Sequence, residues 1–280
     1  MDKICICGAG TMGSGIAQVC ASAGFETILY ETLPAVLRGA KINIEDSLQK
    51  LVSKQIITEG KRKDILSKIY FTSDISECIA DIFIEAIIEN KEVKATLFKQ
   101  LVDLNTSQSI FASNTSSLSI SELAATIPYP DQFAGIHFFN PPSIMKLVEV
   151  ISGKQTKPSV IKRLVQLTNE LGKTPVVCKD APGFIVNRVA RPFYIESLRL
   201  IEEGISDFES IDRILESKGF KMGPFKLMDL IGNDVNYAVS CSVYEQLGKP
   251  ERLKPSFIQK ERVDRKELGK KTGKGYYNYS

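Results

Sequence analysis

The amino-acid sequence predicts an α/β fold: a mostly parallel sheet carrying a helical-hairpin insertion, followed by a smaller all-α domain. Over the first 180 residues or so, short runs rich in β-branched residues alternate with longer stretches of helical periodicity. This alternation is typical of parallel strands joined by helices. After Lys179 the pattern changes, because Asp180-Ala181-Pro182-Gly183 is a turn signal and mainly helical stretches follow it. We therefore expect one domain at residues 1–182 and another at 183–280.

The elements of the first domain follow in a regular order. An apolar run at residues 3–7 leads into an amphipathic stretch that ends at Gly24, and a second run at 27–30 ends at Glu31. The polar, lysine-rich segment 35–68 resembles a pair of helices more than a short crossover, so it predicts the inserted hairpin. Further strands are expected at residues 81–87, 109–113, 133–139, 147–151 and 174–178.

The second domain is expected to consist of helices. Residues 184–204 read as one helix with a bend at Pro192, and two more helical stretches follow Ser206 and Pro224. The stretch GPFKLMDLIGNDVNYAVSCSVYEQL is apolar on more than one stripe, which exceeds what a surface helix of a small domain needs. Burial against a second subunit would account for this, so we predict a homodimer. A tightly packed monomeric domain is the alternative.

Composition and charge exclude several classes of function. The chain of 280 residues has a formal charge of only +3, which does not favour a nucleic-acid or membrane partner. The N-terminus lacks the pattern of a signal peptide, and no apolar run approaches the roughly 20 residues of a membrane span. The six cysteines are scattered without a Cys-x-x-Cys pair. We therefore expect a protein of the reducing cytoplasm, with neither a disulfide framework nor a metal site.

A glycine motif follows the first expected strand. Gly8, Gly10 and Gly13 form G-x-G-x-x-G around Thr11 and Met12, open an amphipathic helix, and precede a strand that ends in an acid. This context is typical of the Rossmann-type turn that binds the pyrophosphate of a dinucleotide at a helix N-terminus.

The acid that ends the second strand bears on the choice of cofactor. Glu31 can accept hydrogen bonds from both ribose hydroxyls, and its charge would repel a 2′-phosphate. These features favour NAD over NADP. The alternative is a glycine-rich turn with a coincidental acid.

Polar residues follow several of the expected strands. Ligands of open α/β sheets bind beyond the carboxyl ends of the strands, so the trailing loops should converge there. The residues in question are Glu89, Lys94, Asn114, Thr115, Ser116, Ser117 and Asn140, with His137 inside its strand. Each also has a structural interpretation, as a solvated helix face, a helix N-cap or a turn. Their shared position at one rim is what favours a functional site.

Several segments of the sequence, in order and spacing, resemble the short-chain 3-hydroxyacyl-CoA dehydrogenases, and the bacterial 3-hydroxybutyryl-CoA type is closest in length. The segments are GAGTMGSGIAQ, IEAIIEN, SNTSSLSI, HFFNPPSIMKLVEVI, KDAPGFIVNR, GFKMGPFKLMDLIG and KTGKGYYNY. The resemblance implies an NAD-dependent oxidoreductase of fatty-acid or butanoate-type metabolism that interconverts 3-hydroxyacyl-CoA and 3-ketoacyl-CoA. One departure is Pro142-Ser143-Ile144, where the family often carries Ala or Val, and it concerns the shape of the pocket.

The resemblance also implies roles for individual residues in catalysis. His137 matches the general base toward the 3-hydroxyl, and Glu149 matches the carboxylate that orients it. Ser116 and Asn187 match the positions that hold the hydroxyl or keto oxygen and the thioester. Asn140 matches a supporting position of the active site.

Further roles concern the cofactor and the CoA moiety. Glu89, Lys94 and Asn114 match cofactor contacts near the nicotinamide ribose. The helical hairpin of the family touches the CoA moiety, and Lys50 and Lys54 are the expected phosphate contacts in this chain.

The residues themselves fit this chemistry. Oxidising a secondary alcohol requires a proton acceptor at the hydroxyl, and histidine exchanges protons near neutral pH. His137 is the only histidine of the chain, and Glu149 lies in the next strand-like run, from which it could return beside the ring. A carboxylate on the second ring nitrogen fixes the tautomer and stabilises the imidazolium. The alternative is that His137 is a bystander in a strand.

Other functions stay open at this point. A related hydroxy-acid dehydrogenase would act on a free acid, and a non-catalytic NAD-binding protein could share the fold. Arg188, Arg191 and Lys221 could serve a carboxylated acyl tail, as in 3-hydroxyadipyl-CoA, or only decorate the surface.

Overall fold

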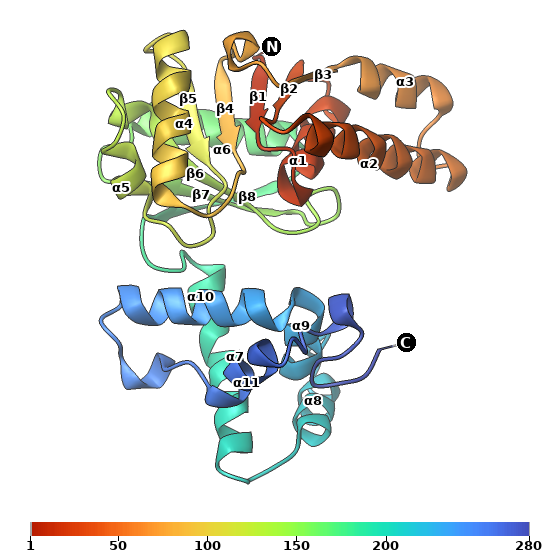
Figure 1. Cartoon of the computed structure of the whole chain (residues 1–280), viewed down its shortest axis with the longest axis vertical. Coiled ribbons are helices and arrows are strands. Elements are labelled where there is room, and N and C mark those ends of the chain that lie inside the picture. Colours follow the sequence, from red (N-terminus) through yellow and green to blue (C-terminus); the bar gives the residue numbers. More distant parts are fainter. Residues whose placement is uncertain (1, 280) are drawn as a thin grey trace. The chain divides into compact units, whose positions relative to one another are not determined.

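An eight-stranded sheet with the order β3-β2-β1-β4-β5-β6-β7-β8 forms the centre of the N-terminal part (Figure 1). The computed structural model describes residues 2–279. The strands are β1 (Ile4–Cys7), β2 (Thr27–Tyr30), β3 (Ile69–Thr72), β4 (Ile82–Glu85), β5 (Ile110–Ser113), β6 (Phe133–Phe138), β7 (Leu147–Ser152) and β8 (Thr174–Lys179). Only β6 and β7 pair antiparallel, and every other neighbouring pair is parallel. The predicted mostly parallel sheet is confirmed.

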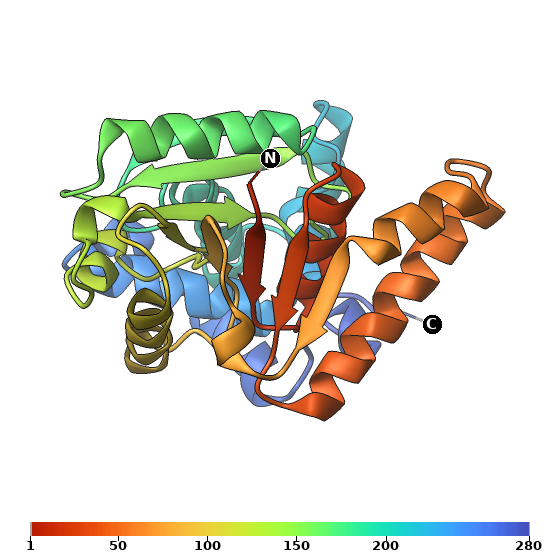
Figure 2. The same ribbon diagram turned by 90° about the horizontal axis from the view of Figure 1, so that it is seen from above.

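Helices cover both faces of this sheet. They are α1 (Thr11–Ser22), α2 (Pro34–Ser53), α3 (Glu59–Ser67), α4 (Lys91–Leu104), α5 (Ile120–Ala124) and α6 (Pro158–Glu170). Figure 2 shows α6 and α4 on opposite faces. Side chains alternate between the faces, as the pleat of a strand requires. Ile84 joins the core cluster that includes α1 and α6, whereas Phe83 stacks on Phe111 at 5.2 Å and Phe98 of α4 meets Phe111 edge-on.

The predicted hairpin is present as α2 and α3, which project beyond the β3 edge of the sheet (Figures 1 and 2). Ala40, Ile44 and Leu48 form the buried stripe of α2 at a spacing of four residues, so one face of the helix packs on the core. Thr58 begins α3, and its hydroxyl accepts a hydrogen bond from the Lys61 backbone N–H at 3.1 Å.

The edge strand β3 is an addition to the expected elements. Its four residues, IYFT, directly follow the hairpin and pair only with β2. Tyr70 keeps 53% of its surface exposed, because one face of this edge strand is uncovered. A run of only four residues carries little strand signal of its own.

The chain divides into two units, Met1–Asp180 and Ala181–Ser280. The second unit is helical, with α7 (Val186–Glu202), α8 (Phe208–Ser217), α9 (Pro224–Ile231), α10 (Asn233–Gln246) and α11 (Phe257–Asp264). Pro192 lies inside α7, and Asp229 of α9 accepts hydrogen bonds from the backbone N–H groups of Tyr276 and Tyr277 at 3.0 Å. The predicted all-α C-terminal part is confirmed. Across residues 2–279, none of the helices combines the length and apolar character that a membrane crossing needs.

Candidate active site

The glycine turn between β1 and α1 leaves a helix N-terminus open to a ligand. Gly8 has a φ of +102°, and a Cβ on Gly13 would lie 1.8 Å from the Gly8 carbonyl oxygen, so a larger residue at position 13 would separate helix from strand. Gly10 caps α1 without a side-chain hydrogen bond. The first N–H groups of the helix, those of Thr11 and Met12, therefore lack a capping side chain and suit an anionic group.

Glu31 follows β2 and is held against this turn. Its Oε2 accepts from the Ala9 backbone N–H at 3.0 Å, and its Oε1 accepts from the Leu33 backbone N–H and the Thr32 hydroxyl, both at 3.1 Å. The carboxylate is thus fixed beside the glycine turn without an ion-pair partner among residues 2–279. An anion site at a helix N-terminus with a fixed acid beside it fits a dinucleotide that has free ribose hydroxyls.

Lys94 lies between two carboxylates at the next strand ends. Its Nζ is 2.5 Å from Oε1 of Glu85 at the end of β4 and 3.1 Å from Oε2 of Glu89. Glu85 is fully buried and also accepts from the Ser113 hydroxyl at 2.6 Å and from the Ile87 backbone N–H at 2.7 Å. Burial raises the pKa of Glu85 above its ordinary value, although Lys94 and these hydrogen bonds oppose the rise. The sequence predicts Lys94 and Glu89 as site residues, and the structure adds Glu85.

Glu89 connects Lys94 to the loop after β5. Its Oε1 accepts hydrogen bonds from the Thr115 hydroxyl at 2.5 Å, from the Ser117 hydroxyl at 2.9 Å and from the Ser116 backbone N–H at 3.2 Å. Partial burial raises the pKa of Glu89, but Lys94 and the hydroxyl donors outweigh it, so the pKa lies below its ordinary value. Glu89 is therefore an ionised acceptor that organises the Ser116 loop.

His137 and Glu149 face each other across the antiparallel pair of β6 and β7. The two residues are direct partners in the register, and His137 Nδ1 is 2.8 Å from Glu149 Oε2. The Glu149 side chain is fully buried and His137 is 6% exposed. An ionised carboxylate only accepts, so Nδ1 carries the donated proton and Nε2 is the proton-accepting nitrogen of the neutral ring.

Two asparagines lie near the end of the histidine strand. Asn114, which follows β5, accepts a hydrogen bond from the Phe138 backbone N–H at 2.8 Å through its Oδ1, which ties the Ser116 loop to the residue next to His137. Asn140 is exposed in the turn after β6 and precedes a cis peptide bond to Pro141. The first unit thus gathers most of the predicted residues around the carboxyl ends of its strands.

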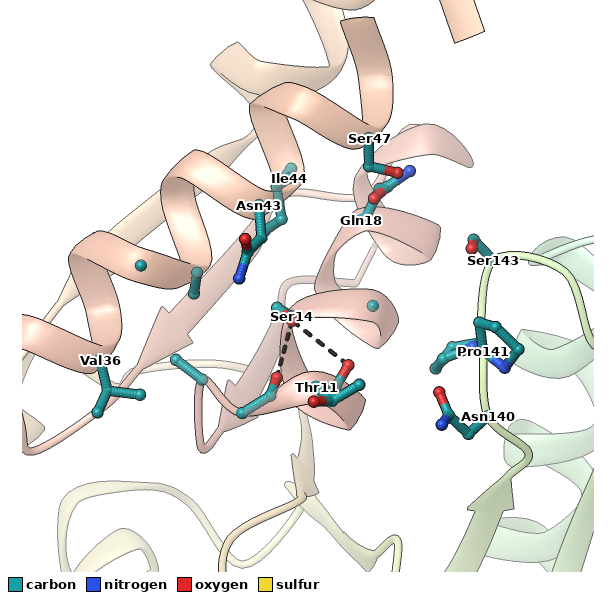
Figure 3. Close-up of a pocket in the computed structure, with 16 residues that line it drawn as sticks. Thr11, Ser14, Gln18, Val36, Asn43, Ile44, Ser47, Asn140, Pro141 and Ser143 are labelled. Atoms are coloured by element: carbon teal, nitrogen blue, oxygen red, sulfur yellow. Dashed lines mark hydrogen bonds between the residues drawn. The ribbon is translucent and has the colours of Figure 1, made fainter. Parts of the chain in front are cut away.

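A cavity of about 530 Å³ opens beside this rim (Figure 3). One wall is the outer face of α1, a second is α2, and a third is the loop after β6. The lining residues are Ala9, Gly10, Thr11, Ser14, Gly15, Gln18, Val36, Gly39, Ala40, Asn43, Ile44, Ser47, Asn140, Pro141, Pro142 and Ser143. The cavity therefore extends from the end of the histidine strand to the inserted hairpin.

Three predicted residues lie apart from this group. Lys50 is in the last turn of α2 and Lys54 caps its C-terminus, and both are exposed without a carboxylate partner in the described chain. The cavity residues Asn43 and Ser47 and the two lysines follow one another along the chain at spacings of four, three and four residues, so the lysines continue the same face of α2. Asn187 is the second residue of α7 in the other unit, and its approach to His137 stays a prediction.

The family profile described as 3-hydroxyacyl-CoA dehydrogenase, NAD binding domain, matches residues 3–181, and the profile of the C-terminal domain matches residues 183–279. The chain belongs to the 3-hydroxyacyl-CoA dehydrogenase family. Its first unit is the family's NAD-binding domain, in agreement with the glycine turn and Glu31. The resemblance drawn from the sequence is confirmed.

Individual members of the family match over the whole chain. A 3-hydroxyadipyl-CoA dehydrogenase of Escherichia coli is 44% identical over 100% of this chain, which spans 59% of that protein. The mitochondrial hydroxyacyl-coenzyme A dehydrogenase of Sus scrofa is 40% identical, with 100% of this chain and 91% of that protein covered. The crystal structure of an (S)-3-hydroxybutyryl-CoA dehydrogenase from Ralstonia eutropha superposes with a TM-score of 0.95 at 36% identity, covering 99% of both chains.

Within this member of the 3-hydroxyacyl-CoA dehydrogenase family, Glu85 is the residue that sequence reasoning missed. It ends an otherwise apolar strand, IFIE, which reads as a buried run closed by a polar residue. The available signal was the Glu-Ala-Ile-Ile-Glu spacing, in which a second acid precedes the lysine. A buried acid needs a cation or several donors nearby, and Lys94 and Ser113 supply both.

We expect Glu85→Gln to weaken NAD binding about tenfold, because the neutral amide leaves Lys94 paired with Glu89 alone and loosens the acceptor of the Ser116 loop. The dissociation constant is measured by the fluorescence of bound NADH. Glu122→Gln is the matched control. It removes the exposed ion pair between Glu122 of α5 and Lys91, which lies in α4 as Lys94 does. Equal dissociation constants for Glu85→Gln and the control would contradict this assignment.

Proposed function

We propose that this chain interconverts 3-hydroxyacyl-CoA and 3-ketoacyl-CoA in acyl-CoA metabolism of the fatty-acid or butanoate type. The observation that carries the proposal is the pair formed by His137 Nδ1 and the fully buried carboxylate of Glu149, 2.8 Å apart. It lies in a sheet whose glycine turn and Glu31 fit NAD. When bound, NAD supplies the hydride acceptor at carbon 3 of the substrate.

His137 is the proposed general base and acid. With its Nδ1 proton directed at Glu149, the ring accepts the 3-hydroxyl proton at Nε2 as the alcohol becomes a ketone. The imidazolium that results faces a carboxylate in a low-dielectric site, which stabilises the charge. In the reverse direction the same nitrogen returns the proton to the ketone oxygen.

The surrounding side chains are proposed to position the reactants. Ser116, together with Asn187 of the second unit, would hold the substrate oxygen and the thioester, and Asn140 would support the active site, as the resemblance implies. The fixed Ser116 loop supports this, because Glu89 accepts from the Ser116 backbone N–H at 3.2 Å. Rigid placement of donors lowers the reorganisation that the reaction needs.

The cofactor contacts are proposed from the same rim. Glu89, Lys94 and Asn114 would contact the nicotinamide ribose, and the burial of Lys94, 1% exposed, supports a fixed position for its ammonium.

The CoA moiety is assigned to the cavity and the hairpin. The cavity begins at Asn140, near the proposed reacting atoms, and its α2 wall leads on to Lys50 and Lys54. Two unpaired ammonium groups at the far end of that face suit the phosphates of CoA. A free hydroxy acid would need neither this cavity nor distant cations, so this arrangement disfavours the free-acid alternative.

A second candidate is an acyl-CoA substrate with a carboxylated tail. Arg191 is 3% exposed, and its guanidinium donates to the Asn187 and Asn236 carbonyl oxygens and to the Ser240 hydroxyl at 2.8–2.9 Å. Burial lowers its pKa to about 10, and no carboxylate in the described chain pairs with it. Arg191 is therefore a buried residue and not a surface cation. Its unpaired charge, and the name of the E. coli relative, favour including 3-hydroxyadipyl-CoA among the substrates tested.

The direct test is consumption of NADH with acetoacetyl-CoA and with 3-ketoacyl-CoA substrates of other chain lengths, a dicarboxylic one included. We expect turnover by the wild type, a loss of about 100- to 10,000-fold in kcat for His137→Ala, and a loss of about 100-fold for Glu149→Gln. Both variants should keep their affinity for NADH, because neither residue belongs to the glycine turn.

Two outcomes would contradict the proposed function. Wild-type protein that consumes no NADH with any of these substrates would exclude the reaction. A His137→Ala variant with a normal rate would show that the histidine is a bystander.

The lysine assignment has its own test. Replacing both Lys50 and Lys54 by Gln should raise KM for acetoacetyl-CoA about tenfold and leave kcat nearly unchanged, because the phosphates lie far from the reacting carbon. The double variant Lys41→Gln with Lys63→Gln removes the same charge from exposed positions of the hairpin outside the cavity. An equal KM for both double variants would argue against a phosphate site at Lys50 and Lys54.

A cytoplasmic homodimer is proposed as the form of the protein. Apolar side chains of the second unit keep large exposed fractions, and uncovered apolar groups of this kind favour association. They are Val189 72%, Ile205 63%, Ile214 61%, Phe257 59%, Leu230 50% and Val235 48%. The cysteines of the chain are free thiols, as in a reducing compartment.

Sedimentation velocity of the purified chain should give twice the mass of one chain, 31.0 kDa. Leu230→Glu with Val235→Glu, a change of two exposed apolar residues, should shift the distribution to the monomer. A wild-type protein that sediments as a monomer at micromolar concentration would contradict the dimer.

A further inference from the structure

Gln18 is a buried glutamine whose side-chain amide has no hydrogen-bond partner within residues 2–279. It lies in the second half of α1, is 6% exposed, and lines the cavity between α1 and α2 (Figure 3). Ser14, one turn earlier on the same face, is satisfied within its own helix, because its hydroxyl donates to the Gly10 carbonyl oxygen at 2.7 Å. The Gln18 amide reaches the cavity and makes no hydrogen bond to the described chain, so it has a donor and an acceptor available to a ligand.

The opposite wall adds polar groups of the same neutral kind. Asn43 and Ser47 of α2 line the cavity, and Figure 3 shows them on the helix that faces α1. Neither side chain has a hydrogen-bond partner in the described part of the chain. The cavity therefore presents uncommitted amide and hydroxyl groups on two walls.

The charge of the lining limits the class of ligand. None of the residues that line the cavity is charged, and the N-terminus of α1 at Gly10 and Thr11 is assigned to the cofactor, so a phosphate or carboxylate beside Gln18 would find no counter-ion. Val36, Ile44 and the ring of Pro142 supply apolar surface beside the polar groups. A neutral chain that alternates methylene and amide groups matches this lining.

The place of the cavity in the first unit limits the ligand further. Asn140 closes the end nearest the His137 strand, and the cationic Lys50 and Lys54 lie farther along the α2 wall. A Cβ on Gly15 would lie 2.9 Å from Pro142 Cδ, so the loop after β6 packs directly on α1 and closes one side. The neutral cavity thus lies between a reactive end and an anion-binding end.

We propose that Gln18 is a specificity-determining residue that recognises an amide of the pantetheine arm of the acyl-CoA. Its Nε2 group donates to the amide carbonyl and its Oε1 accepts from an amide N–H, with Asn43 and Ser47 as further polar partners. This inference rests on the proposed function. It adds that helix α1 recognises the pantetheine arm of the substrate.

The test compares Gln18→Met with the wild type on two substrates. The first is acetoacetyl-CoA, and the second is an acetoacetyl thioester of ethanethiol, which carries the same acyl group without amides. We expect KM for acetoacetyl-CoA to rise about fivefold to tenfold with kcat nearly unchanged, because the contact is made equally in the ground state and the transition state. The value of kcat/KM for the ethyl thioester should stay within about twofold of the wild type.

Two further variants complete the design. Gln18→Glu keeps the shape and the acceptor but loses the donor, so it should also raise KM for acetoacetyl-CoA while leaving the ethyl thioester unaffected. Gln49→Met changes an exposed glutamine of α2 that does not line the cavity, and should match the wild type on both substrates.

Stability distinguishes recognition from packing. Because the Gln18 amide makes no hydrogen bond to the described chain, Gln18→Met should keep a melting temperature close to that of the wild type, whereas the loss of a structural glutamine would lower it.

The outcomes separate the two proposals. An unchanged KM for acetoacetyl-CoA in Gln18→Met, or an equal loss on both thioesters, would overturn the role of Gln18 and leave the dehydrogenase function in place. A wild-type protein inactive on all the 3-ketoacyl-CoA substrates would instead contradict the proposed function itself.

Discussion

The antiparallel pairing of β6 and β7 is the constraint on which the candidate active site depends. In a strand the side chains alternate between the two faces, so a register shift of one residue would turn Glu149 away from His137. The remaining sheet is parallel, and in a parallel pair the second strand would begin only after a crossover. The reversed strand allows a short turn to deliver an acid, twelve positions after the histidine, into direct contact with it.

Burial of the Glu149 carboxylate means that it must have a hydrogen-bond donor or a cation beside it. A carboxylate without water requires donors or a cation, and the sheet places two such groups, Glu149 and Glu85, at positions that are fully buried. Glu85 is satisfied by Lys94, and the imidazole of His137 is the partner of Glu149. Each acid therefore fixes a basic group at the rim, and the two basic groups have different proposed tasks, at the cofactor and at the substrate hydroxyl.

The sequence was sufficient for most of the fold. Regular alternation of apolar runs and helical stretches predicted the mostly parallel sheet, the hairpin and the helical second unit, because burial sets these patterns locally. The strand at 69–72 was not predicted, since an edge strand of four residues has little periodicity to read.

The site was predictable only in part. Residues in recognisable motifs, such as Gly8 and His137, stand out in the sequence. Glu85 and Gln18 do not, because their significance comes from Lys94 nine residues away and from a cavity wall on another helix.

Helix α1 belongs to two sites at once. Its N-terminus lies at the proposed cofactor position, and its outer face, from Thr11 to Gln18, forms a wall of the cavity that we assign to the substrate. Two turns of helix separate these residues, a span of about 10 Å that lies within a single element of the first unit. The helix sets the distance between the proposed positions of the nucleotide and the thioester arm, and a one-residue insertion within it would rotate the cavity face by about 100°. Length variation should therefore be tolerated in the loop between α2 and α3 but not in α1.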